Sequence, residues 1–214
     1  MNQVDVAVIG GGFSAAATII NLMEVLEPQQ TIGVVGRTAG LGLGTAYGLA
    51  DDIHRLNVPA GRMSLFPDRP SHLCDWLRSN GPEYGAEDFI PRRLFGAYVQ
   101  DTFEAQLRRS DNRTRLCFQD AEAIDCDALD DDRQIFHLSS GERLAAKASV
   151  FCIGGTPAGL PLPDDRIAPE ARRHLCLNVW ADRWIERIRP DDTIFMLGSG
   201  LTMVDQVMSL RRRG

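Results

Sequence analysis

The apolar positions near the start of the chain alternate between short continuous runs and helical spacing. Val4 to Ile9 is a short apolar run of the kind that forms a strand buried in a parallel sheet. From Phe13 to Leu26 the apolar residues share one helical face, and Pro28 follows just past the end. Thr31 to Val35 is a second apolar run. This order predicts a right-handed βαβ crossover.

Beyond residue 35 the pattern is less regular. Residues 36–70 are predicted to be mainly glycine-rich loop, and a loop of this length inside a compact domain is usually functional. The elements predicted after it are helices at Ser71 to Ser79 and Pro91 to Arg109, an antiparallel meander from Leu116 to Leu144, and a buried strand from Ala148 to Ile153.

Four prolines between residues 156 and 169 predict a linker between two structural units. The apolar run Ile194 to Leu197 and the helical pattern behind it predict one further strand and helix. We therefore expect an α/β, doubly wound, Rossmann-like domain over residues 1–156, which includes the meander. A linker over 157–190 and the start of a second Rossmann unit over 191–214 would follow.

A glycine-rich turn joins the first predicted strand to the first predicted helix. Its sequence is Gly10-Gly11-Gly12-Phe13-Ser14-Ala15. Gly10 permits a tight turn, Gly12 lets the backbone approach a pyrophosphate, and Ala15 is small enough for the helix to pack close to the sheet. The N–H groups and dipole of the helix N-terminus would face the phosphates. This turn therefore predicts a dinucleotide site.

A second turn of this type, Gly198-Ser199-Gly200, follows the run at Ile194 to Leu197. Two such loops in this order indicate a chain that binds a flavin and also docks a nicotinamide. Only 14 residues follow Gly200, whereas a βαβ unit takes about 30 or more. We therefore expect a truncated second unit with an incomplete NAD(P)H site, in which a preference for NADH or NADPH cannot be read.

The end of the second predicted strand departs from the usual dinucleotide pattern. A carboxylate is expected there to hold the adenosine ribose, but the position is Gly36, followed by Arg37. Either backbone and water hold the ribose, or Arg37 contacts a phosphate or stacks on adenine, or affinity has been lost. If the ribose lies at this position, Gly36→Glu should tighten binding of the dinucleotide.

Composition excludes several other classes of function. The net charge of −6 and the lack of a basic stripe argue against a nucleic-acid partner. No apolar run approaches the roughly 20 residues that span a bilayer, and the chain begins directly with a strand rather than a signal segment. Five scattered cysteines favour reduced thiols in the cytoplasm. The acidic turn Asp125 to Asp132 lacks metal-ligand spacing, so no metal site is expected.

Several stretches, taken together, resemble a known family. They are Gly10-Gly11-Gly12-Phe13-Ser14, Gly42-Leu43-Gly44-Thr45-Ala46-Tyr47-Gly48, Leu56-Asn57-Val58-Pro59-Ala60-Gly61-Arg62-Met63-Ser64, Pro91-Arg92-Arg93-Leu94-Phe95-Gly96-Ala97-Tyr98 and Gly198-Ser199-Gly200-Leu201-Thr202-Met203-Val204-Asp205. In this order, and over essentially the whole chain, they resemble the FAD/NAD(P)-binding family, bacterial flavoprotein oxidoreductases related to N-hydroxylating and other class B monooxygenases. Because members are usually much longer, the resemblance implies that this chain corresponds to their N-terminal portion.

The resemblance implies an FAD-dependent, NAD(P)H-linked oxidoreductase, with monooxygenase chemistry as one form. The alternatives are a non-catalytic FAD-binding module or remnant and, more remotely, a protein that binds only NAD(P) or S-adenosylmethionine. Because the cofactor would carry the chemistry, we name no acid, base or nucleophile. The substrate and the oligomeric state are not readable. The cofactor-binding candidates are Gly10, Gly11, Gly12, Phe13, Ser14, Ala15, Arg37, Gly44, Tyr47, Asn57, Arg62, Met63, Ser64, Gly155, Gly198 and Gly200.

Overall fold

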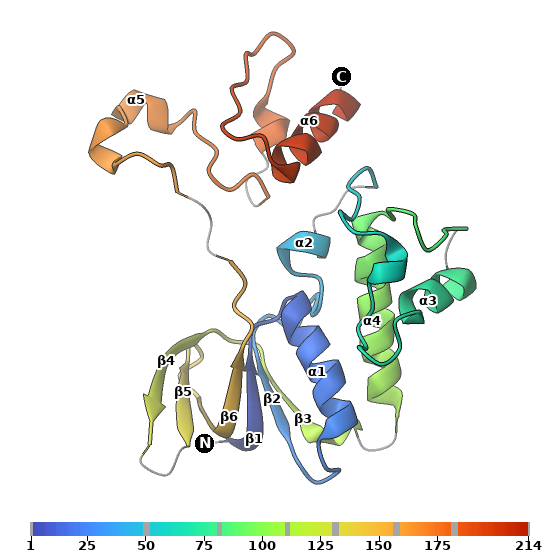
Figure 1. Ribbon diagram of the computed structural model, residues 1–214. Helices are drawn as coiled ribbons and strands as arrows, with labels where there is room; N and C mark the ends of the chain where they lie inside the picture. Colours follow the sequence, from blue (N-terminus) through green and yellow to red (C-terminus); the bar gives the residue numbers. More distant parts are fainter. Residues whose placement is uncertain are drawn as a thin grey trace. The chain divides into compact units, whose positions relative to one another are not determined.

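A computed structural model describes residues 2–48, 52–80, 83–109, 112–129, 133–155, 159–180 and 184–213. The chain divides into two compact units, Met1–Gly154 and Gly155–Gly214, and each unit is described by itself. The first unit carries the sheet and most of the helices, labelled in Figure 1.

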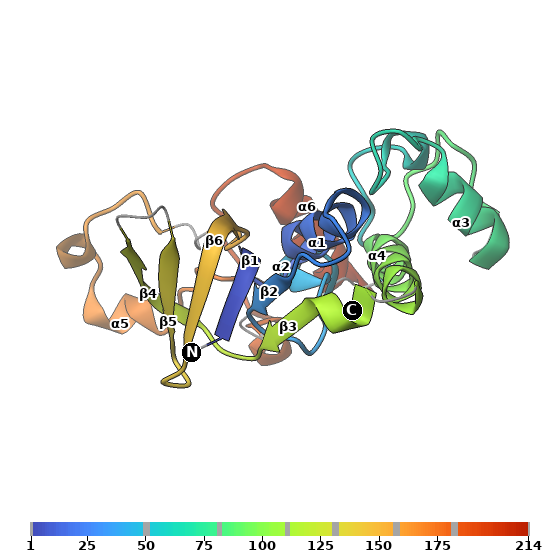
Figure 2. The same cartoon turned by 90° about the horizontal axis from the view of Figure 1, so that it is seen from below.

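A six-stranded mixed sheet forms the frame of the first unit, with strand order β3-β2-β1-β6-β5-β4 (Figure 2). The strands are β1 (Asn2–Ile9), β2 (Ile32–Val35), β3 (Leu116–Gln119), β4 (Ala123–Ala128), β5 (Gln134–Leu138) and β6 (Arg143–Phe151). Strands β3, β2, β1 and β6 run parallel, while β5 is antiparallel to both β6 and β4. The predicted Rossmann-like α/β domain with an antiparallel meander is confirmed, although the helices among its described residues do not cover both faces of the sheet as a doubly wound domain would require.

The meander is shorter than its predicted range of Leu116 to Leu144. Its first segment, β3, pairs parallel to β2, with Ile32 opposite Leu116 and Val35 opposite Gln119. An apolar run has the same pattern in either orientation, and the sequence does not show which edge it joins. The helical crossover between β2 and β3 returns the chain parallel to β2, so this strand extends the parallel sheet.

The helices lie together on one face of the sheet, with α1 nearest to it and α4 beyond (Figures 1 and 2). The predicted helices of the first unit are confirmed within one or two residues at each end. The helical segments are α1 (Phe13–Val25), α2 (Gly44–Gly48), α3 (His72–Asn80), α4 (Arg92–Arg108) and the short 3₁₀ turns η1 (Ala60–Arg62) and η2 (Asn112–Arg115).

Two apolar clusters hold the sheet in place. On the helix side, Val8 and Val34 belong to a fully buried cluster with Ile19 and Ile20 of α1. On the other side, a smaller cluster joins Ala7, Ile9 and Val35 to Phe136 and Leu138 of β5, and to Leu144 and Ala146 of β6. Each large buried side chain contributes about 1.5–3 kcal/mol. The clusters position the carboxyl ends of β1 and β2 side by side.

Strand β6 differs from its prediction as a buried strand at Ala148 to Ile153. It begins at Arg143, and its buried part is Leu144–Ala146. Val150 and Phe151 are 36% and 58% exposed. The apolar run marks the end of the strand correctly, but only the first half of the strand takes part in a buried cluster.

The second unit contains α6 (Leu201–Arg213), the short helix α5 (Pro169–Arg172), and the turns η3 (Asp164–Arg166) and η4 (Trp184–Arg187). The predicted helix after the second glycine loop is present. The predicted strand at Ile194 to Leu197 is not: within residues 159–180 and 184–213 no strand forms, and Phe195 is 89% exposed. A strand needs a neighbour to accept its backbone hydrogen bonds, and this unit offers none there.

The boundaries of the parts differ from the predicted 1–156, 157–190 and 191–214. The compact units meet at Gly154 and Gly155, and residues 156–158 lie outside the described ranges. Much of the predicted linker belongs to the second unit. Trp184 Nε1 donates to Oε1 of Gln206 at 3.2 Å, so η4 packs on α6.

Three findings concern membrane-spanning helices, cysteines and metal sites, which were also considered from the sequence. No helix among the described residues is long and apolar enough to cross a membrane. The five cysteines are free thiols. No cluster of His, Cys, Asp or Glu in the described ranges could hold a metal ion.

Candidate functional site

Three parallel strands end side by side at one edge of the sheet. Ile9 lies opposite Val35, and Val35 lies opposite Gln119, so β1, β2 and β3 terminate in line. The turns that follow are Gly10–Gly12, Gly36–Thr38 and Asp120. In open α/β sheets, ligands bind outside the carboxyl ends of the strands. This edge is the candidate site.

The first two glycines of the loop are packed against other backbone. Gly10 has φ +133°, and a β-carbon there would lie 2.2 Å from the carbonyl oxygen of Cys152. A β-carbon on Gly11 would lie 2.6 Å from the carbonyl oxygen of Arg37. Both positions therefore require glycine for the fold itself.

Gly12 is different, because a β-carbon there would collide with no neighbouring atom. The nearest atom to an ideal β-carbon there is the Cα of Gly44, at 3.8 Å. Gly12 is also the N-cap of α1, where no side chain caps the helix and the first turn carries no acidic residue. The positive end of the helix dipole and its uncapped N–H groups thus lie beside an uncrowded stretch of backbone, which suits an anion.

In the rest of the predicted loop motif, the side chains of Phe13 and Ala15 pack against neighbouring elements. Ala15 is completely buried against the sheet, as its predicted role requires, and Ser14 is exposed. The ring of Phe13 contacts Tyr47 edge-on and Phe95 at a tilt, both with centroids 5.5 Å apart. Burial raises the pKa of Tyr47. Phe13 and Tyr47 therefore fasten α2 beside the start of α1.

The predicted functional loop after β2 lies directly on the glycine turn. The N–H of Gly42 donates to the carbonyl oxygen of Gly11 at 3.1 Å. A β-carbon on Gly44, where φ is +52°, would lie 3.2 Å from the Cα of Gly12. The fold thus brings Gly44 and Tyr47 to the Gly10–Gly12 turn, as expected if they belong to one cofactor site.

The backbone conformation and close packing of Gly36 explain why no acidic residue occupies the end of β2. Its φ is +154°, and a β-carbon there would stand 2.9 Å from the backbone nitrogen of Gly11. A side chain at this position would push the end of β2 away from the glycine turn. The expectation that Gly36→Glu tightens binding is therefore wrong. Arg37 is exposed, and its backbone lies against Gly11.

A carboxylate does reach this edge, but from the neighbouring strand. Asp120 follows β3, and its Oδ1 accepts the N–H of Thr38 at 3.1 Å. The N–H of Gly36 donates to the carbonyl oxygen of Gln119 at 3.1 Å, which holds the two strand ends together. Sequence reasoning missed Asp120 because it counted along the chain to β2 alone. The one available signal was an acid directly after an apolar run.

The segment around Asn57 lies elsewhere. Asn57 and Arg62 are exposed, while Met63 packs against the main cluster. The hydroxyl of Ser64 donates to the carbonyl oxygen of Arg69 at 2.8 Å and accepts the N–H of Phe66 at 3.1 Å, which closes a local turn. Asn21 Nδ2 donates to the carbonyl oxygen of Leu65 at 3.0 Å, so this segment lies beside the middle of α1.

The last three candidates belong to the second unit. A β-carbon on Gly155, Gly198 or Gly200 would meet no atom within 4 Å, and Gly198 has φ +109°. Gly198 and Gly200 precede α6 as predicted. All three residues lie in Gly155–Gly214, which is described by itself.

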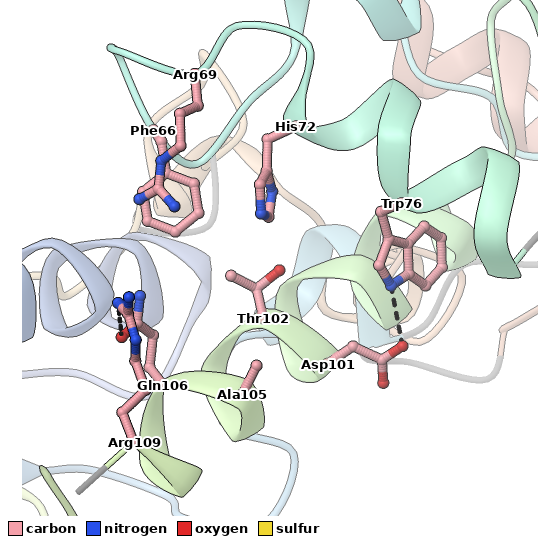
Figure 3. A pocket seen from close by; sticks show the side chains of 9 residues that line it. All are labelled: Phe66, Arg69, His72, Trp76, Asp101, Thr102, Ala105, Gln106 and Arg109. Atoms are coloured by element: carbon pink, nitrogen blue, oxygen red, sulfur yellow. Dashed lines mark hydrogen bonds between the residues drawn. The ribbon is translucent and has the colours of Figure 1, made fainter.

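A separate cavity of about 290 Å³ lies between α3 and α4 (Figure 3). It is lined by Phe66, Arg69, His72, Trp76, Asp101, Thr102, Ala105, Gln106 and Arg109. Trp76 Nε1 donates to Oδ2 of Asp101 at 3.0 Å. Burial and the charge of Arg69 lower the pKa of His72, whose Nδ1 lies 2.8 Å from Tyr98 Oη. No sequence motif marked this cavity, because its residues come from the turn before α3, from α3 and from α4, and they meet only in the folded chain.

The charged end of this cavity is organised around Glu24 of α1. Its Oε1 accepts from Arg69 Nη2 and Arg109 Nη1, each at 3.0 Å, and from Gln106 Nε2 at 2.6 Å. Burial would raise the pKa of Glu24, but the hydrogen bonds and the two guanidinium charges together lower it. These contacts fasten α1 to α4 and to the turn before α3, which is a structural task.

Comparison with known proteins supports the dinucleotide interpretation. The FAD-NAD(P)-binding family model matches residues 7–156. This range contains the first glycine loop and Asp120, whereas the second glycine loop lies outside it, so the family match is shorter than the whole-chain resemblance. No curated protein matches the sequence significantly.

Solved structures with a similar fold are flavin monooxygenases. An oxidised steroid monooxygenase bound to NADP has TM-score 0.52 and 16% identity, over 75% of this chain and 28% of that chain. A closed cyclohexanone monooxygenase has TM-score 0.54 and 21% identity, over 77% and 28%. A doubly substituted flavin monooxygenase from Stenotrophomonas maltophilia has TM-score 0.50 and 20% identity, over 71% and 38%. This chain spans about a third of their lengths, and the likeness establishes the fold.

Proposed function

The chain belongs to the FAD-NAD(P)-binding family, and on this premise we propose that it acts in an FAD-dependent, NAD(P)H-linked oxidoreductase. The observation that supports this most directly is the uncrowded backbone of Gly12 at the uncapped N-terminus of α1. In the proposal, the Gly10–Ala15 backbone holds the pyrophosphate of FAD. Monooxygenase-type chemistry is the form that the fold neighbours favour.

The described residues fit such a group. A β-carbon on Gly10 or Gly11 would collide with backbone, whereas one on Gly12 would only touch the Cα of Gly44 at 3.8 Å, so Gly12 is the position that a phosphate could approach. The uncapped N–H groups of α1 would donate to phosphate oxygens, and the helix dipole would favour their charge. Phe13, Tyr47 and Phe95 pack on one another and would keep the loop rigid beneath the ligand.

When bound, FAD supplies redox chemistry by accepting a hydride and passing electrons on. The chain contributes binding and orientation. Arg37 and Gly44 would border the cofactor beside the glycine turn, and Asn57 and Arg62 are proposed donors to its flavin end. We assign no side chain the role of acid, base or nucleophile.

The Gly198–Gly200 turn is proposed to face the nicotinamide nucleotide. It precedes α6 and is open, with no atom within 4 Å of either ideal β-carbon. No strand forms in the described part of this unit. This observation favours a second candidate function, a module that binds FAD but is not itself reduced by NAD(P)H.

Flavin binding by the purified full chain tests the proposal. The wild type should bind FAD and show a flavin absorption band. Gly12→Val should remove binding, because a branched side chain would occupy the pyrophosphate cradle. Gly159→Val is the matched control: it makes the same change where no atom lies within 4 Å, and it should leave binding intact. If Gly12→Val retains stoichiometric FAD while folded, the site is misplaced.

Anaerobic addition of NADH or NADPH separates the two candidate functions. Bleaching of the flavin band supports the oxidoreductase. Flavin that binds to the chain but stays oxidised supports the non-catalytic module. A wild-type chain that takes up no FAD at any concentration counts against both.

A further inference from the structure

We infer that Asp120 supplies the carboxylate that holds the adenosine ribose of the dinucleotide, in place of an acid on β2. This inference rests on the proposed FAD site at the Gly10–Ala15 turn. It concerns a residue from a different strand than the one that dinucleotide-binding folds ordinarily use.

An acid from another strand is needed because Gly36 occupies the position from which an acid usually holds the ribose. Ribose hydroxyls are ordinarily held by an Asp or Glu at the end of the second strand. Here a side chain at that position is excluded, because a β-carbon on Gly36 would lie 2.8 Å from the carbonyl carbon of Gly10. The close packing of β2 on the glycine turn therefore displaces the acid from its usual place.

Asp120 stands on the same edge of the sheet, one strand further along. It follows Gln119, which lies opposite Val35, the last residue of β2. Its Oδ1 accepts the N–H of Thr38 at 3.1 Å, two residues past Gly36. The carboxylate is thus tied to the turn that a ribose above the end of β2 would face.

The carboxylate also has capacity for a ligand. Asp120 is exposed, and a carboxylate can accept several hydrogen bonds, about four in all. Its Oδ2 accepts no hydrogen bond from any residue that the structure describes. Because the Thr38 bond restricts rotation of the side chain, less conformational entropy is lost when the free oxygen accepts from a ribose hydroxyl.

Arg37 is compatible with this arrangement. It is exposed beside the same turn, and its carbonyl oxygen packs on Gly11. A cation there can meet a phosphate while Asp120 meets the hydroxyls. Two of the alternatives from the sequence make no use of Asp120. In one, backbone and water hold the ribose; in the other, the affinity for the dinucleotide has been lost.

The test compares ligands with and without ribose hydroxyls. Binding of FAD, ADP and 2′,3′-dideoxy-ADP is measured for the wild type, Asp120→Asn, Asp120→Ala and the control Glu122→Gln. Asp120→Asn keeps an oxygen that can accept the Thr38 N–H but removes the charge. Glu122 is an exposed acid two residues away, so its variant makes the same charge change off the site.

We expect Asp120→Asn to weaken FAD and ADP binding about tenfold, as for loss of a hydrogen bond to a charged group. The wild type should prefer ADP over dideoxy-ADP by a similar factor, and Asp120→Asn should abolish that preference. Glu122→Gln should change none of these affinities by more than about twofold.

Two results would overturn the inference. One is an Asp120→Asn variant that binds FAD as tightly as the wild type. The other is an unchanged preference for ADP over dideoxy-ADP, for example because both bind equally more weakly, which would mean that Asp120 only shapes the turn. In both cases, FAD binding by the wild type and its loss in Gly12→Val still uphold the proposed function. Only a wild type that binds no FAD would contradict both the inference and the proposed function.

Discussion

Gly36 packs on Gly10 so closely that a β-carbon on residue 36 would stand 2.8 Å from the carbonyl carbon of residue 10. The end of β2 thereby rests on the turn that leaves β1. The N–H of Gly10 adds a 2.7 Å hydrogen bond to the carbonyl oxygen of Val35. This contact makes the absence of a side chain at residue 36 a condition of the fold.

Gly36→Ala should destabilise the first unit by about 2–4 kcal/mol, because it combines an unfavourable backbone conformation with overpacking. Gly141→Ala separates the two effects. Gly141 has φ +84° with nothing within 4 Å of an ideal β-carbon, so only the conformational cost of about 1–2 kcal/mol applies. Urea unfolding measures both. Equal losses in the two variants would show that the end of β2 can move away from the turn.

Arg115 should be essential for the end of α1. Its buried guanidinium donates to the carbonyl oxygens of Leu26, Glu27 and Gln30 at 3.0–3.1 Å and to Asn112 Oδ1 at 3.1 Å. Arg115→Met would remove all four hydrogen bonds, although the Glu27 carbonyl oxygen would still accept the N–H of Gln30, and it should cost about 2–4 kcal/mol in chemical unfolding. The exposed neighbour Arg113 provides the comparison, and Arg113→Met should stay within about 0.5 kcal/mol. Similar losses for both would refute the capping role.

Asp5 should make stability depend on acid pH. The side-chain hydrogen bond from Lys147 and the N–H of Thr31 lower the pKa of Asp5 below its ordinary value of 3.8. Its contribution to stability is therefore complete above about pH 4–5 and is lost as the pH falls through the lowered pKa. Asp5→Asn should be less stable than the wild type at pH 7, with the difference shrinking towards pH 2. A difference that is constant with pH would show that the charge of Asp5 is not involved.

Trp184 should report the integrity of the second unit. It is 8% exposed, and its Nε1 donates to Gln206 Oε1 at 3.2 Å. In a Trp76→Phe, Trp180→Phe background, Gln206→Ala should shift the Trp184 fluorescence to longer wavelength, because the indole loses its partner and part of its cover. Ser209→Ala, at a half-buried position one helical turn further along α6, is the control. An unshifted spectrum in Gln206→Ala would mean that Trp184 is buried by other contacts.

Local pattern was sufficient to predict most of the elements of the first unit. The continuous apolar run of β1, the single apolar face of α1 and the glycines between them each depend on neighbours in sequence, so spacing reveals them. The same holds for α3, α4 and α6. The aromatic contact of Phe13 with Tyr47 followed from no such rule, because it joins α1 to the short helix α2, more than thirty residues further along the chain.

Orientation and burial required the three-dimensional structure. The apolar run at Leu116–Gln119 predicted a strand, but only pairing with β2 decided that it is parallel. Phe151 is apolar and yet 58% exposed, because burial depends on what covers a residue. The run at Ile194 to Leu197 predicted a strand that does not form, because a strand exists only with a partner.

By itself, the sequence determined the dinucleotide turn, since Gly10, Gly12 and Ala15 act through their own backbone or small size. It also showed that an acid is missing at residue 36. Only the tertiary structure decided why, and which acid stands nearby. Asp120 is 84 residues from Gly36 in sequence, and the turns that hold them meet because β3 pairs beside β2. Contacts across a sheet depend on strand order, which no local pattern specifies.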